Sequence, residues 1–220
     1  MGENNSNVLK FYSDDKNILE LNNATRNPLK MWEKDVALNY FPSDARILNV
    51  GCGMGREAFN LYDMGFKITA IDISEKAIIG ARNLASETKR NVTFLTTNGI
   101  DLSFDDSSFD VVIIWNQTFG LMYTESKQVA FLKECKRVLK DNGIISFSGH
   151  EREYEEINYP QCLEGKKFFP YKNEDIYWEI FTMDELRDLA QKSGFNVLNC
   201  ERGKIYREEE GTIIHCVCRK

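Results

Sequence analysis

The glycine-rich stretch Ile47–Phe59, ILNVGCGMGREAF, limits most strongly what this chain can fold into. A short apolar run of strand type leads into three glycines at alternate positions, and a helical pattern begins directly after them. Glycine at a strand-to-helix turn permits a positive φ, lets a ligand approach the backbone closely, and leaves N–H groups open at a helix N-terminus. The stretch therefore predicts a ligand-binding turn at the carboxyl edge of a parallel sheet.

Strand-like and helix-like segments alternate from Arg46 to about residue 149, which favours an α/β fold with a parallel sheet. We expect strands at RILNV, KITAI, VTFL, FDVVIIW and GIISFSG, and helices at REAFNLYDMG, EKAIIGARNLASE and SKQVAFLKECKRVL. Ser74 is placed to cap the second of these helices. Further on, the capping box Thr182–Glu185 opens another helix, and FNVLNCE and TIIHCVCR follow as two strands joined by a charged connection.

The charge and the cysteines exclude several classes of protein. A formal net charge of −6 argues against a large basic surface for nucleic acid. No apolar run is long enough to span a membrane, and no secretory signal begins the chain, so a cytoplasmic location is expected. The six cysteines form no CxxC motif. We therefore expect free thiols, and no metal site.

The spacing of the glycines limits the classes of ligand that the turn can bind. Gly51, Gly53 and Gly55 form GxGxG followed by Arg56, whereas a dinucleotide site uses GxGxxG and a P-loop ends in Gly-Lys-Ser/Thr. The turn is therefore poorly suited to a pyrophosphate or a triphosphate. Asp72 ends the second predicted strand at the same edge of the sheet, where a carboxylate can accept hydrogen bonds from two ribose hydroxyls. The alternative role for Asp72 is to cap the following helix.

Together these segments resemble the motif series of class I S-adenosylmethionine-dependent methyltransferases in order, spacing and content. The likeness rests on ILNVGCGMGREA, ITAIDIS, FDVVII and VLKDNGIISF, and it covers residues 46–149 closely and 182–218 more loosely. It implies an α/β fold that is Rossmann-like, with a seven-stranded, mostly parallel sheet, an antiparallel last strand and helices on both faces. The two predicted C-terminal strands fit that ending.

The resemblance implies a role for each motif in binding S-adenosyl-L-methionine or its product, S-adenosyl-L-homocysteine. The glycine turn would pass under the methionine part, Asp72 would hold the ribose, and Ile73 would pack on the adenine. The loop after the third strand would face the adenine edge, and the end of the fourth strand would lie where cofactor and acceptor meet. The residues so implied are Gly51, Cys52, Gly53, Gly55, Asp72, Ile73, Asn98, Gly99, Ile100, Trp115 and Asn116.

Two positions depart from the family pattern, and one choice stays open. Asn49 and Asn98 stand where the family often has Asp, so each keeps a hydrogen-bonding oxygen and loses the charge. In this family the N-terminal segment often folds over the cofactor, and Arg26 in that segment is a candidate partner for the methionine carboxylate. Arg56 is its rival, and the sequence does not choose between them.

The same likeness divides a single domain, residues 1–220, into four parts. Residues 1–45 form an N-terminal helical cap, 46–149 the cofactor-binding core, 150–181 an acceptor-side insertion, and 182–220 a C-terminal helix and strand pair. The segment WNQTFGLMY, after the fourth strand, resembles small-molecule N- and O-methyltransferases with an Asn-x-Thr/Ser-Phe-Gly turn. It lacks the Asn/Asp-Pro-Pro-Tyr signature of enzymes that methylate amides and bases, which argues for a small-molecule acceptor.

His150, which closes the fifth strand, is the candidate general base, with Glu151 as a possible partner. The alternative is an ordinary histidine at the end of a strand. His215, inside the last strand, is expected to be packed in the core. Five aromatic residues of the insertion are expected to form either a lid over a planar or cationic acceptor or simple core packing: Tyr154, Tyr159, Tyr171, Tyr177 and Trp178.

The leading interpretation is an enzyme that moves a methyl group from S-adenosylmethionine to nitrogen or oxygen of a small molecule. One alternative changes the acceptor to RNA or a protein side chain. Another is a cofactor-binding regulator or scaffold without turnover. A dehydrogenase is the weakest alternative, because the glycine spacing does not suit a pyrophosphate.

Overall fold

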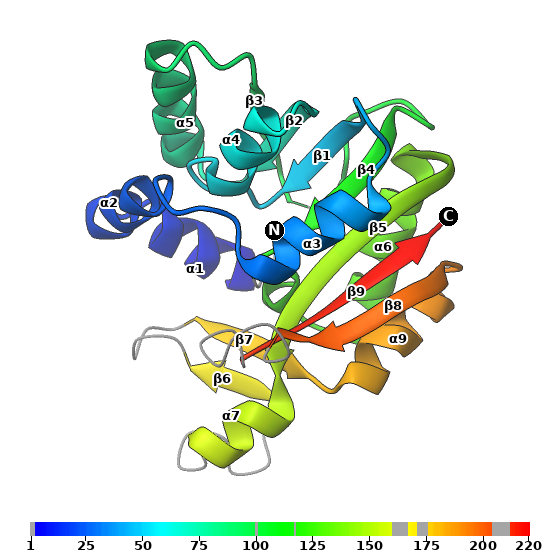
Figure 1. Cartoon of the computed structure of the whole chain (residues 1–220). Helices are drawn as coiled ribbons and strands as arrows, with labels where there is room; N and C mark the ends of the chain where they lie inside the picture. Colours follow the sequence, from blue (N-terminus) through cyan, green and yellow to red (C-terminus); the bar gives the residue numbers. More distant parts are fainter. Residues whose placement is uncertain (1–2, 100, 117, 160–166, 171–175, 204–211) are drawn as a thin grey trace.

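The computed structural model describes residues 3–99, 101–116, 118–159, 167–170, 176–203 and 212–220. Its centre is a parallel sheet in the order β3-β2-β1-β4-β5 (Figure 1). Antiparallel β9 pairs with the outer side of β5, and β8 pairs with β9. The seven strands expected of the sheet are therefore present, with the last one antiparallel as expected. The seven strands are β1 (Arg46–Val50), β2 (Lys67–Asp72), β3 (Thr93–Thr96), β4 (Phe109–Ile114), β5 (Leu139–Glu151), β8 (Asn196–Arg202) and β9 (Ile213–Arg219).

Helices cover both faces of the sheet (Figure 1). On one face pack α3 (Met31–Tyr40), α4 (Arg56–Asp63) and α5 (Glu75–Glu87), and on the other α6 (Glu125–Val138) and α9 (Met183–Lys192). Two further helices, α1 (Glu3–Tyr12) and α2 (Asp15–Ala24), lie at the N-terminus, and a 3-10 turn, η1 (Thr118–Leu121), follows β4. None of the helices within the described ranges is long and apolar enough to cross a membrane.

The central strand β4 shows why its sequence is apolar at nearly every position. Val111 and Ile113 join the core beneath α3, α4 and α5, whereas Val112 and Ile114 join the core beneath α6 and α9. All four side chains are fully buried. A strand covered on both faces needs apolar residues on both, as a parallel sheet with helices on each side requires.

Two predicted helix caps are present. The Ser74 hydroxyl accepts a hydrogen bond from the Ala77 backbone N–H at 3.3 Å at the start of α5. Thr182 and Glu185 form the expected reciprocal capping box at the start of α9. Each cap satisfies backbone donors that the first helical turn leaves unpaired.

The stretch 150–181 contains more structure than its sequence suggested. It includes the end of β5, the short helix α7 (Arg152–Asn158), and an antiparallel pair of strands, β6 (Phe168–Pro170) and β7 (Tyr177–Phe181). Strand β7 runs parallel to the last residues of β5 and extends the sheet there. The helix was not predicted, because α7 buries little besides Glu155 and so has no apolar periodicity to reveal it.

The expectation of free thiols is wrong for one pair of cysteines. Cys200 on β8 and Cys216 on β9 lie directly opposite each other, with their Cα atoms 4.1 Å apart, and form a disulfide. Antiparallel pairing places both side chains on the same face, and export signals and cysteine spacing do not reveal this strand register. The buried free thiols are Cys52, Cys135 and Cys218, and Cys162 lies outside the described residues.

Candidate functional site

The glycine turn links β1 to α4 and takes a conformation that favours glycine. Gly51 has φ 69° and Gly55, the N-cap residue of α4, has φ 94°. A Cβ on Gly51 would lie 2.3 Å from the Thr118 methyl carbon, and one on Gly55 would lie 2.8 Å from the Phe94 ring. Both the backbone conformation and the space therefore exclude larger residues.

Asp72, at the end of β2, fastens the turn to the neighbouring strand. One carboxylate oxygen accepts a hydrogen bond from the Gly53 N–H at 2.8 Å, and the other accepts one from the Ser74 N–H at 2.9 Å. Burial raises the pKa of Asp72 above its ordinary value, and the backbone N–H donors partly offset that rise. The Ile73 N–H also interacts with this carboxylate, which keeps lone-pair capacity for a ligand. Asp72 thus supports the start of α5, as the capping alternative held, while facing the cavity described next.

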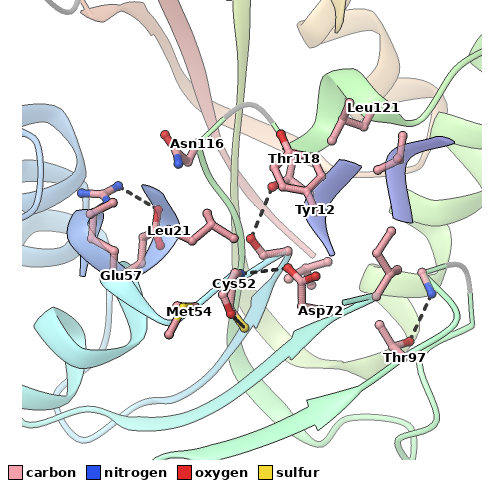
Figure 2. Close-up of a pocket in the computed structure, with 18 of the residues that line it drawn as sticks. Tyr12, Leu21, Cys52, Met54, Glu57, Asp72, Thr97, Asn116, Thr118 and Leu121 are labelled. Atoms are coloured by element: carbon pink, nitrogen blue, oxygen red, sulfur yellow. Dashed lines mark hydrogen bonds and ion pairs between the residues drawn. The ribbon is translucent and has the colours of Figure 1, made fainter. Parts of the chain in front are cut away.

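A single cavity runs over the turn and past Asp72 (Figure 2). Elements far apart in the sequence build it: α1 and α2, the β1–α4 turn, the ends of β2 and β3, and the loop after β4. Seven of the eleven core positions implied by the resemblance line it: Gly51, Cys52, Gly53, Asp72, Ile73, Gly99 and Asn116. Arg56, the rival candidate for the methionine carboxylate, also lines the cavity. The remaining lining residues are Val8, Tyr12, Leu21, Ala24, Val50, Met54, Glu57, Thr97, Thr118, Leu121 and Met122.

The N-terminal helices close one side of this cavity. The Ser74 hydroxyl donates a hydrogen bond to the Tyr12 carbonyl oxygen at 2.9 Å and lies 3.2 Å from the Ser13 hydroxyl. Lys76 forms an ion pair with Asp15 at the start of α2. The N-terminal helices α1 and α2 therefore contact the rest of the chain at the start of α5.

Arg56 and Glu57 follow the turn and lie at one end of the cavity. Arg56 forms ion pairs with Glu33 of α3 at 2.6 Å and with Glu57 at 2.7 Å. Burial by itself would lower the pKa of Arg56, but the two carboxylates outweigh burial and raise it. The guanidinium is therefore charged and committed to two acidic neighbours.

Four implied residues lie away from the cavity lining. Arg26 is exposed, and Asn98 bonds within its own loop, donating to the Asp101 carboxylate at 3.2 Å. Gly55 lies under the Phe94 ring at the start of α4. Trp115 is buried in the core and donates a hydrogen bond from Nε1 to the Ser146 hydroxyl at 2.8 Å. Ile100 lies outside the described residues, as does Gln117.

The alternation of side chains along β4 explains why Trp115 lies in the core and not in the cavity. It continues the face of β4 that carries Val111 and Ile113, so its ring joins the core beneath α3 and contacts Trp32 at 5.4 Å between ring centroids. The next residue, Asn116, points to the other side and lines the cavity. This alternation, which is visible in the sequence, could have shown that Trp115 and Asn116 point to opposite sides.

His150 lies at the end of β5, outside the cavity lining, and its side chain is 10% exposed. Its Nδ1 atom is 3.3 Å from a carboxylate oxygen of Glu155 on α7, and its ring lies 4.6 Å from the Trp178 ring. Glu151, the expected partner, instead pairs with Arg202 at 2.5 Å. That expectation is wrong because successive strand residues point to opposite faces. No described member of the aromatic set lines the cavity, and Tyr171 lies outside the described residues.

Two buried polar residues belong to the core instead of the cavity. His215 is fully buried and stacks on Trp32 at 4.5 Å, as expected for a packed histidine. Burial lowers its pKa to about 4, so the imidazole is neutral near pH 7. Asn49 on β1 is buried, and its amide nitrogen has no hydrogen-bond partner among the described residues.

Comparison with known proteins identifies the class that this fold and cavity define. Residues 47–143 match the family described as a methyltransferase domain. A demethylmenaquinone methyltransferase of Tropheryma whipplei is 34% identical over 170 residues, which cover 71% of this chain and 68% of the relative. The chain therefore belongs to the class I S-adenosylmethionine-dependent methyltransferase family.

Two solved structures share the fold. A SAM-dependent methyltransferase from Methanosarcina mazei has a TM-score of 0.74 at 21% sequence identity, over 88% of this chain and 99% of that one. The 1,6-didemethyltoxoflavin-N1-methyltransferase of Burkholderia thailandensis, solved with its substrate and S-adenosylhomocysteine, has a TM-score of 0.71 at 19% identity, over 98% of this chain and 86% of that one. These likenesses extend the agreement in fold to almost the whole chain.

Proposed function

We propose that this chain transfers a methyl group from S-adenosylmethionine to nitrogen or oxygen of a small molecule by in-line displacement. The observation that carries the proposal is the cavity that joins the glycine turn to Asp72 at the carboxyl edge of the sheet. When bound, the cofactor supplies an activated methyl group on a positively charged sulfur.

The residues present fit an adenosyl cofactor. Gly51 and Gly53 line the cavity without side chains, so a ligand can approach their backbone closely, and the Asp72 carboxylate is placed to accept from ribose hydroxyls. Ile73 and Gly99 line the part of the cavity beside Asp72 and are suited to a flat base. Carboxylates at both ends, Asp72 and Glu57, suit a ligand that carries positive charge.

The chain's own task in such a reaction is to position the acceptor and keep water out. Leu121 and Met122, in the loop after β4, provide apolar walls of the cavity, and Asn116 of the same loop provides an amide. Relatives named for small-molecule substrates, a quinone in one case and 1,6-didemethyltoxoflavin in the other, support a small-molecule acceptor.

His150 is proposed to take the proton when the acceptor is an amine or a hydroxyl. The Glu155 carboxylate lies 3.3 Å from Nδ1, so the neutral ring would carry its hydrogen there. Nε2, which is buried and has no hydrogen-bond partner among the described residues, would keep its lone pair for the acceptor proton. Glu155 would then stabilise the imidazolium that forms. The contact with Trp178 holds the ring in place from the side.

The two alternatives predict different behaviour. A methyltransferase that acts on RNA or protein would label macromolecules and leave small molecules unlabelled. A regulator without turnover would bind S-adenosylhomocysteine and label neither. The acidic net charge of −6 counts against RNA.

The direct test incubates the purified protein with methyl-labelled S-adenosylmethionine and a small-molecule metabolite extract, and with RNA and protein fractions in parallel. We expect label to appear in the small-molecule fraction and to be lost with the Asp72→Ala variant. Label confined to RNA or protein would contradict the proposed acceptor. Binding without label in any fraction would favour the regulator.

A further inference from the structure

The end of the cavity away from Asp72 contains one guanidinium held between two carboxylates. Arg56 donates from Nη1 to the Pro28 carbonyl oxygen at 3.0 Å and to Glu33 at 2.9 Å. It donates from Nη2 to the other oxygen of Glu33 at 2.6 Å and to Glu57 at 2.7 Å. All the terminal N–H donors of the guanidinium are thereby used within the protein.

This arrangement leaves Arg56 poorly placed to receive a ligand carboxylate. A new anion would have to displace Glu33 or Glu57, and the Glu33 side chain is fully buried. Separating a buried carboxylate from the cation that pairs with it leaves an uncompensated charge, which is costly. Arg56 is also the single basic side chain among the described lining residues. A ligand carboxylate thus finds no free cation there.

Glu57, unlike Arg56, keeps capacity to bind a ligand. One of its oxygens accepts the bond from Arg56, and its other oxygen has no hydrogen bond to the described residues, although Glu57 lines the cavity. With two carboxylates around one guanidinium, the cluster carries a net negative charge. A negative cluster with an unused acceptor favours a cationic group.

The two ends of the cavity suit the two ends of one ligand. In Figure 2, Glu57 lies on one side of the turn residue Cys52 and Asp72 lies on the other. A ligand whose ribose meets Asp72 would therefore extend its remaining chain across the turn toward Glu57. In the cofactor that chain ends in an α-ammonium and a carboxylate.

We propose that Glu57 binds the α-ammonium of the cofactor, and that Arg56 is a positioning residue that holds Glu57 and is not a ligand of the cofactor carboxylate. The inference rests on the proposed function. It answers the choice between Arg26 and Arg56 by assigning the carboxylate to neither, since Arg26 is exposed and outside the lining. Recognition of the cofactor at the Glu57 end of the cavity then depends on its α-ammonium.

The test compares the binding of three ligands to the unmodified protein by calorimetry. The first is S-adenosylhomocysteine, the second its analogue without the α-amino group, and the third its analogue without the carboxylate. We expect loss of the amine to weaken binding at least tenfold, as loss of a charge-assisted hydrogen bond does, and loss of the carboxylate to weaken it less than threefold. A larger effect of the carboxylate would overturn the inference.

The Glu57→Gln variant tests whether Glu57 is the residue that binds the α-ammonium. It keeps an oxygen that can accept from Arg56 and removes the charge, so the penalty for deleting the amine should shrink to less than threefold. Glu87→Gln, at the exposed end of α5, is the matched control and should keep the full penalty. An unchanged amine penalty in Glu57→Gln would assign the ammonium elsewhere.

Methylthioadenosine, which lacks the amino-acid part, separates the possible failures. Equal binding to the variant and to the unmodified protein shows that the adenosyl end is intact. If Glu57→Gln fails to bind it, the comparison of the analogues on the unmodified protein alone decides the question. If no adenosyl compound binds the unmodified protein, the proposed function fails and the inference fails with it.

Discussion

Both oxygens of Asp72 accept backbone hydrogen bonds, from Gly53 and Ser74, while the carboxylate faces the cavity. A carboxylate held by two N–H donors is fixed in orientation before any ligand arrives. Preorganisation of this kind lowers the cost of binding, because fewer side-chain rotamers are lost. Asp72 therefore connects the conformation of the turn to the affinity for the ligand.

Replacing Asp72 by Ala should weaken the binding of S-adenosylhomocysteine by roughly 1–3 kcal/mol, the cost of lost charge-assisted hydrogen bonds. Because burial raises the pKa of Asp72, affinity for the unmodified protein should also fall on acidification at a pH above that of an ordinary aspartate. Calorimetry at several pH values measures both effects. Unchanged affinity in Asp72→Ala would remove the ribose assignment.

The proposed role of His150 predicts an effect on the rate of methyl transfer. Replacing His150 by Ala should slow labelled methyl transfer by about 10²–10⁴-fold if the ring is the general base. Replacing Glu155 by Gln should slow it less and change the pH profile, since the group that orients the ring is lost while the ring remains. Full activity of His150→Ala at every pH would show that the acceptor needs no base from this residue.

At the scale of elements, α3 is joined to β9 through a buried aromatic contact. Trp32 of α3 stacks on His215 of β9 at 4.5 Å and also contacts Trp115 after β4. The same helix supplies Glu33, which holds Arg56 at the cavity. Packing of α3 on the sheet therefore fixes one end of the candidate site.

The low pKa of His215, about 4 against an ordinary 6.5, makes stability depend on pH. Between these values the unfolded chain binds a proton that the folded chain does not, so stability falls as the pH drops through this window. The full loss is roughly 3 kcal/mol. In His215→Phe, which keeps an aromatic ring beside Trp32, urea unfolding should show a smaller decrease from pH 6.5 to 4. An equal decrease would mean that another group causes it.

The elements differ in how far their sequences predict them. The glycine turn, Asp72 and the five parallel strands could be predicted because their signals are local: spacing, apolar runs and caps. The contributions of α1 and α2 to the cavity could not, because they depend on how distant helices dock. Glu155 was missed for the same reason, since only folding of α7 brings it beside His150.

For the whole molecule, the mostly parallel sheet with an antiparallel last strand follows from the family resemblance, and the disulfide between β8 and β9 does not. Most of the implied residues on the turn and after the strands line one cavity, whereas Gly55 and Trp115 do not. The contribution of the N-terminal helices was not predicted, and the expected partner of His150 was wrong. Short-range patterns thus locate the Asp72 end of the cavity, and tertiary packing decides its other end.

The proposed function requires that the cavity over Gly51–Gly55 bind the adenosyl part of the cofactor. A crystal structure of the protein with S-adenosylhomocysteine would test this. We expect the ribose hydroxyls within hydrogen-bonding distance of the Asp72 carboxylate and the amino-acid chain extended past the turn toward Glu57. Density for the compound at any other place, or a ribose that does not contact Asp72, would contradict it.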